Sequence, residues 1–253
     1  MPRFSANLGF LWADLPLPDA IRAAARAGFD AVECHWPYDS DPALVRAALE
    51  ETGLPMLGLN TAKGGEGQFG LLALPDEEKA ARTSIDQAIS YAAAIGAANI
   101  HAMAGIAKGP AAEAVFRANL QYACEKAGEY GVTILIEPIN THDVPGYFLG
   151  STGQAERLIA ELGLPNLKLM FDCYHVARMG ENVLERLEAL LPVTGHIQFA
   201  SVPDRGSPDH GDLDYEEVFA RLDEWGWEKP LGAEYRPAGE TAASLAWLDS
   251  GRR

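Results

Sequence analysis

Cysteine is scarce in this sequence of 253 residues, where it occurs only as Cys34, Cys124 and Cys173 with no CxxC pair. This argues against a disulfide framework and against a cysteine-ligated zinc site. Few cysteines are typical of a reducing compartment, so we expect a cytoplasmic protein. Disulfides are also not needed, because a chain of this length can bury roughly three-quarters of its unfolded surface.

Basic residues are also few. Twenty Lys and Arg against 36 Asp and Glu give a formal net charge of −16 at pH 7. The sequence has no cluster of Lys or Arg, and an acidic chain repels phosphate backbones, so no nucleic-acid partner is expected. An anionic small substrate is still compatible if a metal ion or a few arginines reverse the local field.

Long apolar runs are lacking too. Residues 1–16 contain no clean apolar stretch and include Asp14, so they do not resemble a secretion signal. The segment 89–107 carries no charge, but it is rich in Ala and Gly and includes Asn99 and His101. We interpret it as a helix end, a turn and a strand, and we therefore expect no membrane association.

The sequence does contain a regular alternation of short β-like runs and longer amphipathic runs. The predicted strands are 4–10, 31–36, 56–60, 99–103, 133–137, 167–172, 195–200 and 231–235; the predicted helices are 18–27, 42–52, 76–95, 111–130, 152–162, 183–191, 215–225 and 241–248. Eight βα units without a linker predict an α/β fold, a single (β/α)₈ TIM barrel over residues 1–253. A doubly wound open sheet is the alternative, although it usually has fewer strands.

Polar residues recur at the carboxyl ends of these strands, in alternation with apolar ones. The clearest are Glu137, Asp172, Gln198 and Glu234, one from each of the last four strands. Alternate residues of a barrel strand face the lumen, and barrel enzymes keep their active sites at this end. Three carboxylates and an amide oxygen suit Mg²⁺ or Mn²⁺. The alternative is four separate salt bridges at the barrel mouth.

Other residues are weaker candidates for binding substrate. His175 lies three residues after Asp172, so it could orient a ligand or touch the substrate. The remaining candidates are His101, Arg205, His210, Arg236 and Lys63. Each has an ordinary alternative, because histidines at such positions are often packed in the core and arginines often neutralise a neighbouring acid or lie in solvent.

A glycine-rich stretch at 65–70 formally matches the dinucleotide-binding pattern GxGxxG. That interpretation requires a helix to begin there, but Leu71-Leu72-Ala73-Leu74-Pro75 follows instead. We therefore expect no nucleotide cofactor. A flap over the barrel mouth with Phe69 at its apolar tip is the preferred interpretation, and Trp12, Trp36 and Phe148 are candidates for walls of the pocket.

Seven motifs spread over nearly the whole chain carry a resemblance to a known family. They are the segments 7–12, 136–141, 144–147, 171–175, 196–198, 202–205 and 234–237. Together they resemble the hydroxypyruvate isomerase family of xylose-isomerase-like barrels. The resemblance implies that Glu137 and Glu234 are the acid/base pair and that Glu137, Asp172, Gln198 and Glu234 hold the metal. Related ketose epimerases usually have His in place of Gln198.

The resemblance also implies a reaction, the interconversion of hydroxypyruvate and tartronate semialdehyde. A divalent ion would polarise the carbonyl, and a glutamate would move a proton between adjacent carbons through an enediolate. Arg205, His210 or Arg236 would hold the substrate carboxylate. Barrels of this kind often pair, so a homo-oligomer is compatible with the resemblance.

Three alternatives are kept. The same site could isomerise a longer acid such as a 2-oxo-tetronate, or epimerise a ketose. A metal-dependent phosphodiesterase or abasic-site nuclease shares this barrel, although it favours several histidines and a basic groove. A non-catalytic ligand-binding barrel is the third alternative, and the presence of both Glu137 and Glu234 argues against it.

Overall fold

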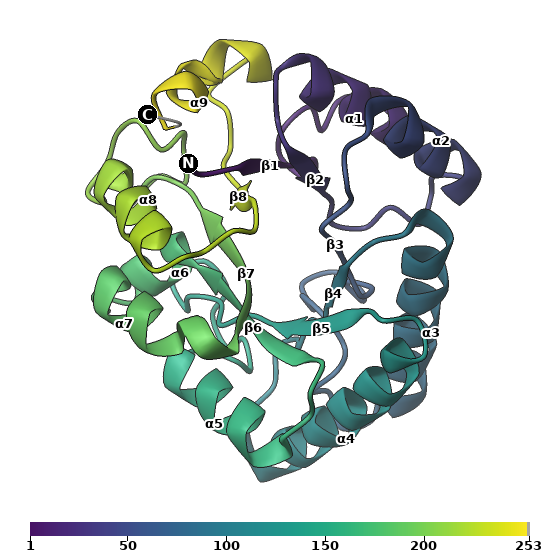
Figure 1. Ribbon diagram of the computed structural model, residues 1–253. Coiled ribbons are helices and arrows are strands. Elements are labelled where there is room, and N and C mark those ends of the chain that lie inside the picture. The colour runs from purple at the N-terminus through teal and green to yellow at the C-terminus, as the bar shows by residue number, and fades with distance from the viewer. Residues whose placement is uncertain (252–253) are drawn as a thin grey trace.

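The computed structural model describes residues 1–251, in which eight parallel strands form a barrel inside a ring of helices (Figure 1). The strands are β1 (Phe4–Asn7), β2 (Ala31–Glu33), β3 (Gly58–Asn60), β4 (Asn99–His101), β5 (Thr133–Ile136), β6 (Leu167–Asp172), β7 (Thr194–Phe199) and β8 (Leu231–Ala233). The helices are α1 (Leu17–Arg26), α2 (Pro42–Thr52), α3 (Glu78–Ile95), α4 (Gly109–Gly128), α5 (Thr152–Leu162), α6 (Cys173–Arg178), α7 (Val183–Leu190), α8 (Tyr215–Glu224) and α9 (Ala246–Ser250). This confirms the predicted (β/α)₈ barrel.

The barrel is nearly closed. Hydrogen-bonded strands follow the order β2-β1-β8-β7-β6-β5-β4-β3, and β2 then meets the segment just before β3 through a parallel bridge between Val32 and Met56. Two further backbone bonds cross this seam, from Leu57 N to Val32 O at 2.7 Å and from Cys34 N to Gly58 O at 3.0 Å. All strands run in one direction, so their carboxyl ends and the side chains there meet at one mouth.

Helix ends follow the local capping signals. The Asp41 side chain accepts from Ala43 N at the start of α2, where Pro42 takes the first helical position, and the Ser151 hydroxyl accepts from Gln154 N at the start of α5. Gly53 ends α2 with a positive φ of 71°, which glycine adopts without a steric penalty from a Cβ atom. These helices have the boundaries predicted from the sequence.

Some predicted boundaries are wrong. The strand predicted over 4–10 ends at Asn7, because the Phe10 and Leu11 amides turn back to the Asn7 carbonyl. The helix predicted over 241–248 is a 3₁₀ turn, Thr241–Ser244, followed by α9. Helix α6 was not predicted at all. It begins directly after β6 because the Asp172 carboxylate accepts from Tyr174 N at 2.9 Å.

An aromatic cluster joins strands β1 and β7 to the outer helices α8 and α9. The Phe4 ring of β1 lies 5.1 Å from the Phe219 ring of α8 and 5.1 Å from the Trp247 ring of α9, centroid to centroid. Phe199 of β7 packs on the same rings, at 5.0 Å from Phe219 and 5.4 Å from Trp247. The cluster therefore holds together the part of the barrel where the chain begins and ends.

None of the described helices is long and apolar enough to span a membrane.

Candidate active site at the carboxyl ends of the strands

Polar side chains from several strands lie together in the lumen at the carboxyl ends of the strands, as the alternation along each strand predicts. Glu137 follows β5, Asp172 ends β6, Gln198 lies in β7 and Glu234 follows β8, and all four are buried. Asp172 and Gln198 are register partners across β6 and β7. Three further residues join them: Asn7 of β1, Glu33 of β2 and His35 just after β2. The first two are buried, and the His35 side chain is 15% exposed.

Glu234 has partners on both carboxylate oxygens. Its Oε1 accepts from Asn7 Nδ2 at 3.1 Å and lies 2.9 Å from His35 Nε2, while its Oε2 accepts from Arg205 Nη2 at 2.6 Å. Burial by itself would raise the pKa of Glu234, but Arg205 and then His35 outweigh it and lower that pKa. Glu234 is therefore held as a carboxylate.

Glu137 and Asp172 are less well satisfied. Glu137 Oε1 and Asp172 Oδ2 are buried without a hydrogen-bond partner among the described residues. Burial raises the pKa of Glu137 well above its usual range, helped by the nearby charges of Glu234 and Asp172. Burial also raises the pKa of Asp172, to about 7, although Arg205 works in the opposite direction. Two buried, poorly paired carboxyls favour either protons or a cation between them.

His175 faces both of these carboxyls. Its Nε2 lies 3.6 Å from Glu137 Oε1 and 3.5 Å from Asp172 Oδ2, and one donor atom from each of the three residues lies within 4.8 Å of the others, which is close enough to hold a metal ion. The other ring nitrogen, Nδ1, accepts from the Asn140 backbone N–H at 3.3 Å. Burial lowers the pKa of His175 to about 3, so the ring is neutral and carries its proton on Nε2. In this tautomer His175 is a hydrogen-bond donor.

Gln198 presents a further free acceptor. Its Nε2 donates to Glu33 Oε1 at 2.7 Å, and its Oε1 is buried without a partner within residues 1–251. Glu33 was not a candidate in the sequence analysis, although its position at the end of a strand on the lumen side was a usable signal. It also accepts from Asn7 Nδ2 at 3.0 Å and lies 2.7 Å from His196 Nε2.

Arg205 is the cation of the site. Its guanidinium lies between the rings of Phe10 and Tyr174, 5.1 Å and 5.0 Å from their centroids, and 3.6 Å from Asp172 Oδ2. The residue has a φ of +57°, unusual for a side chain with Cβ, and its backbone is held by Ser201 O and Arg236 N. The loop after β7 thus fixes this arginine over the carboxylates.

His210, Arg236 and Lys63 lie away from the carboxylates. The half-exposed His210 ring pairs with Asp204 at 2.9 Å and with Asp209 at 3.5 Å. Arg236 is exposed with its guanidinium 5.5 Å from the Phe10 ring, and Lys63 is exposed with Nζ 4.8 Å from the Phe69 ring.

Two other predicted residues are buried. His101 lies with Nδ1 3.5 Å from Glu137 Oε2. Phe148 packs on Phe116 of α4, which makes it part of the core.

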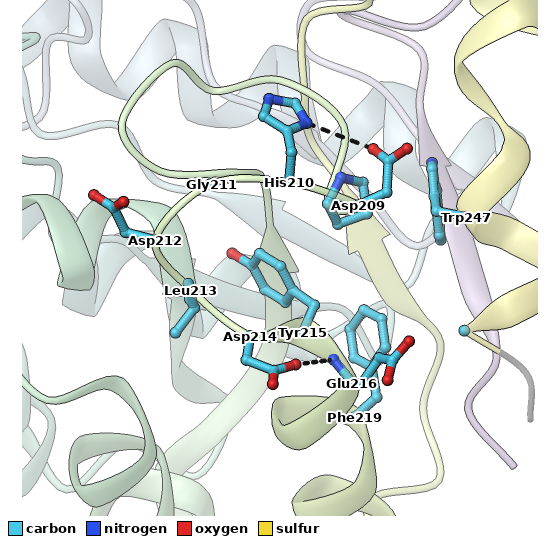
Figure 2. Close-up of a pocket in the computed structure, with 12 residues that line it drawn as sticks. Asp209, His210, Gly211, Asp212, Leu213, Asp214, Tyr215, Glu216, Phe219 and Trp247 are labelled. Carbon is cyan, nitrogen blue, oxygen red and sulfur yellow. Dashed lines mark hydrogen bonds and ion pairs between the residues drawn. The ribbon is translucent and has the colours of Figure 1, made fainter.

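Two other features of the surface lie outside this site. A hollow of about 470 Å³ beside α8 is lined by His210, Tyr215, Phe219 and Trp247 (Figure 2), but by none of the site carboxylates. The stretch 65–70 is not followed by a helix, since Gly70 forms an antiparallel bridge with Ala104 and α3 begins at Glu78. The structural requirement of the dinucleotide motif is therefore not met.

Known proteins are similar to this chain in sequence and in fold. A family model described as "Xylose isomerase-like TIM barrel" matches residues 21–251. The chain belongs to this family. A 2-oxo-tetronate isomerase of Cupriavidus necator is 42% identical over 254 residues, covering 98% of both chains. A Mus musculus protein named "Putative hydroxypyruvate isomerase" is 40% identical over 262 residues, covering 98% of this chain and 94% of its own. These relatives support an isomerase.

Solved structures agree on the fold. A Brucella melitensis structure named as an AP endonuclease, family 2, superposes with a TM-score of 0.94 at 36% identity, covering 99% of both chains. The 3-keto-D-glucoside 4-epimerase YcjR from E. coli superposes with a TM-score of 0.82 at 22% identity and 99% coverage of both chains, a likeness that concerns the fold alone.

The raised pKa of Asp172 predicts how metal-free stability depends on pH. A carboxyl with a folded pKa of about 7, above its unfolded value of about 3.9, stabilises the fold fully below the lower value and loses that contribution as the pH rises to the upper one. In EDTA we expect the wild-type Tm to fall by several degrees between about pH 5 and pH 8, since each kcal/mol is worth about 2–4 °C at this size.

The matched variants are Asp172→Asn, which keeps an oxygen for Tyr174 N, and Asp86→Asn, which changes an exposed acid. Asp172→Asn should flatten this pH dependence and respond little to added Mn²⁺, whereas wild type and Asp86→Asn should regain Tm. A wild-type Tm that changes neither with pH nor with added Mn²⁺ in calorimetry would contradict the raised pKa of Asp172 and its place in a metal site.

Proposed function

We propose that this protein is a metal-assisted isomerase of short 2-oxo acids that interconverts hydroxypyruvate and tartronate semialdehyde. The observation that carries the proposal is the contrast between two kinds of buried group at one barrel mouth. Glu137, Asp172 and Gln198 each present an acceptor oxygen without a partner in the described chain, beside a fully partnered Glu234. The relatives named as hydroxypyruvate and 2-oxo-tetronate isomerases support the same chemistry.

The residues fit a divalent ion. The three free acceptor atoms are Glu137 Oε1, Asp172 Oδ2 and Gln198 Oε1, an all-oxygen set suited to Mg²⁺ or Mn²⁺. Glu234 would complete the predicted set by releasing Arg205. His175 stays outside the set because Asn140 occupies its Nδ1 and leaves the proton on Nε2. When bound, such an ion polarises the substrate carbonyl and acidifies the adjacent C–H bond.

Arg205 is our choice for the substrate carboxylate. Its Nε is buried without a partner among the described residues, and its planar fork is already held between Phe10 and Tyr174. A substrate carboxylate that takes the guanidinium away from Glu234 removes a cation that lowers the pKa of that glutamate. Binding of the acid therefore opposes the effect of a bound ion, which would lower the pKa of Glu234 and make it a weaker base.

Glu234 then takes a proton from C3 of hydroxypyruvate, and the electrons of that C–H bond form the C2–C3 double bond of an enediolate. The Nε2–H of His175 is available to donate to a substrate oxygen as charge develops on it. A glutamate returns the proton to C2, either Glu234 itself or Glu137 opposite, while the hydroxyl proton passes from the C3 oxygen to the C2 oxygen. No electrons leave the substrate, so no redox cofactor is consumed.

The decisive assay is proton NMR of the purified protein with hydroxypyruvate in D₂O, with Mn²⁺ or Mg²⁺ and again with EDTA. We expect metal-dependent formation of tartronate semialdehyde, reduced by about 10²–10⁴-fold in both Glu234→Gln, which removes the base, and Glu137→Gln, which removes an oxygen that would hold the ion and the second acid/base candidate. The exposed Glu129→Gln is the matched control. Retained activity in both site variants would overturn the assigned roles. In the same D₂O assay, C2 of the product should carry the proton that left C3 if one carboxyl moves it, and should carry solvent deuterium if two carboxyls take part.

Substrate length is decided by the same assay. No turnover and no exchange with hydroxypyruvate would move the proposal to 2-oxo-tetronates and ketoses, which the same residues could process. The Brucella structure bears the name of an AP endonuclease, so abasic-site DNA is a necessary further substrate to test. We expect neither cleavage nor a gel shift at physiological salt, because a chain of net charge −16 opposes a phosphate backbone.

Arg205→Ala should raise the KM for hydroxypyruvate by about 10–100-fold, the range of one charge-assisted contact. The exposed Arg236→Ala and His210→Ala, which the sequence analysis kept as alternatives to Arg205, should change KM by less than about threefold. In the free enzyme, losing the cation raises the pKa of Glu234, so the acidic limb of the kcat/KM profile should move to higher pH in Arg205→Ala alone. A larger KM effect in either control would reassign the carboxylate site.

A further inference from the structure

We infer that Glu33 is a positioning residue that turns the Gln198 carboxamide so that its oxygen faces the cation site. The inference rests on the proposed function, since it concerns the residues that would hold the metal ion. It assigns a task to a buried carboxylate that the acid/base chemistry does not use. It also explains how Gln198 can be a metal ligand: without such a partner, its side-chain amide could equally turn its NH₂ group toward the ion.

The contact between the two side chains has a fixed polarity. Gln198 Nε2 donates to Glu33 Oε1 at 2.7 Å, and an ionised carboxylate can only accept hydrogen bonds. Gln198 must therefore turn its NH₂ group toward Glu33 and its Oε1 away from it. That Oε1 is buried and has no partner in the described chain. A neutral acceptor oxygen is the end of the amide that a hard cation binds.

Two further side chains hold Glu33 in place. Asn7 Nδ2 donates to the same Oε1 at 3.0 Å, and His196 Nε2 lies 2.7 Å from Oε2. Glycine at 232 leaves the space for this carboxylate, because a Cβ atom there would lie 2.7 Å from Glu33 Oε1 and 2.8 Å from Gln198 Cγ. A carboxylate so confined can define the orientation of the groups that contact it.

The same carboxylate connects to the proposed base. The Asn7 carboxamide donates through Nδ2 both to Glu33 Oε1 and to Glu234 Oε1, at 3.0 Å and 3.1 Å, while its Oδ1 accepts from the Gly9 amide at 2.9 Å. One amide thus holds two carboxylates at a fixed separation. Glu33 therefore orients a metal-facing amide on one side and is linked to Glu234 on the other.

The test is Mn²⁺ binding to the EDTA-stripped protein, followed by EPR of free Mn²⁺ so that no substrate or turnover is needed. Glu33→Met keeps the length of the side chain but removes the acceptor, and it should weaken Mn²⁺ affinity by about 10–100-fold, as loss of a partner that orients a metal ligand does. Glu33→Gln can keep an oxygen toward Gln198 and should stay within about threefold of wild type. His196→Gln leaves the Glu33–Gln198 contact in place and is the matched control.

Thermal stability separates positioning from a structural role. If Glu33 serves packing alone, Mn²⁺ affinity should follow Tm across all three variants. If it positions Gln198, affinity should fall only where the acceptor facing Gln198 is lost, whatever the Tm of His196→Gln. The alternative is that Gln198 Oε1 points only into the barrel interior near His101 and Met170 and never contacts the ion. Glu33→Met would then leave Mn²⁺ affinity unchanged, and the inference would be overturned.

A double variant keeps the test decisive if Glu33→Met fails to fold. In Glu33→Gln with Gln198→Glu the polarity of the contact is reversed, and a carboxylate oxygen again faces the cation site. We expect the double variant to bind Mn²⁺ at least as tightly as wild type, whereas a folded double variant without Mn²⁺ affinity contradicts the inference. Wild-type protein that binds no Mn²⁺ refutes the proposed function itself, and wild type and Glu33→Met that bind equally refute only the role of Glu33.

Discussion

Four carboxylates are buried within one barrel mouth, and most of the surrounding structure follows from the cost of placing like charges in a dry interior. Glu33 and Glu234 meet that cost with hydrogen-bond donors and cations from the chain itself. Glu137 and Asp172 do not, and their pKa values are raised in consequence. The mouth is therefore divided in two. Around Glu33 and Glu234 the carboxylates are paired by the chain itself, whereas the site at Glu137 and Asp172 favours a cation.

This division gives each glutamate of the proposed acid/base pair a different environment. Glu137 is surrounded by acids and neutral histidines, since burial lowers the pKa of His101 and of His175 to about 3. Glu234 is bound to Arg205, the one cation that the sequence-predicted candidates bring within 4 Å of the described site carboxylates. Because Arg205 contacts both Glu234 and Asp172, a ligand that competes for its guanidinium would change the charge balance on both sides.

The loop after β7 decides where that cation lies. Its backbone conformation at Arg205 is one that side chains with Cβ rarely adopt, and it is stabilised by hydrogen bonds to Ser201 and from Arg236. His210 contributes to the same loop by pairing with Asp204, which also bonds to Ser201. A residue considered for substrate contact therefore supports the loop that carries the contact.

Local patterns in the chain were enough to predict the barrel and the strand ends on which polar groups occur, because a period of two in a strand and of 3.6 in a helix are local properties. They were also enough for the starts of helices such as α2 and α5, where capping residues act within one turn. Helix α6 escaped prediction because its cap, Asp172, is at the same time the last residue of a strand. Long-range packing, in contrast, brings Glu33 against Gln198 and places Arg205 rather than His210 or Arg236 on Glu234. Such choices depend on which side chains of eight separate strands share one dry space, and no local pattern encodes those distances.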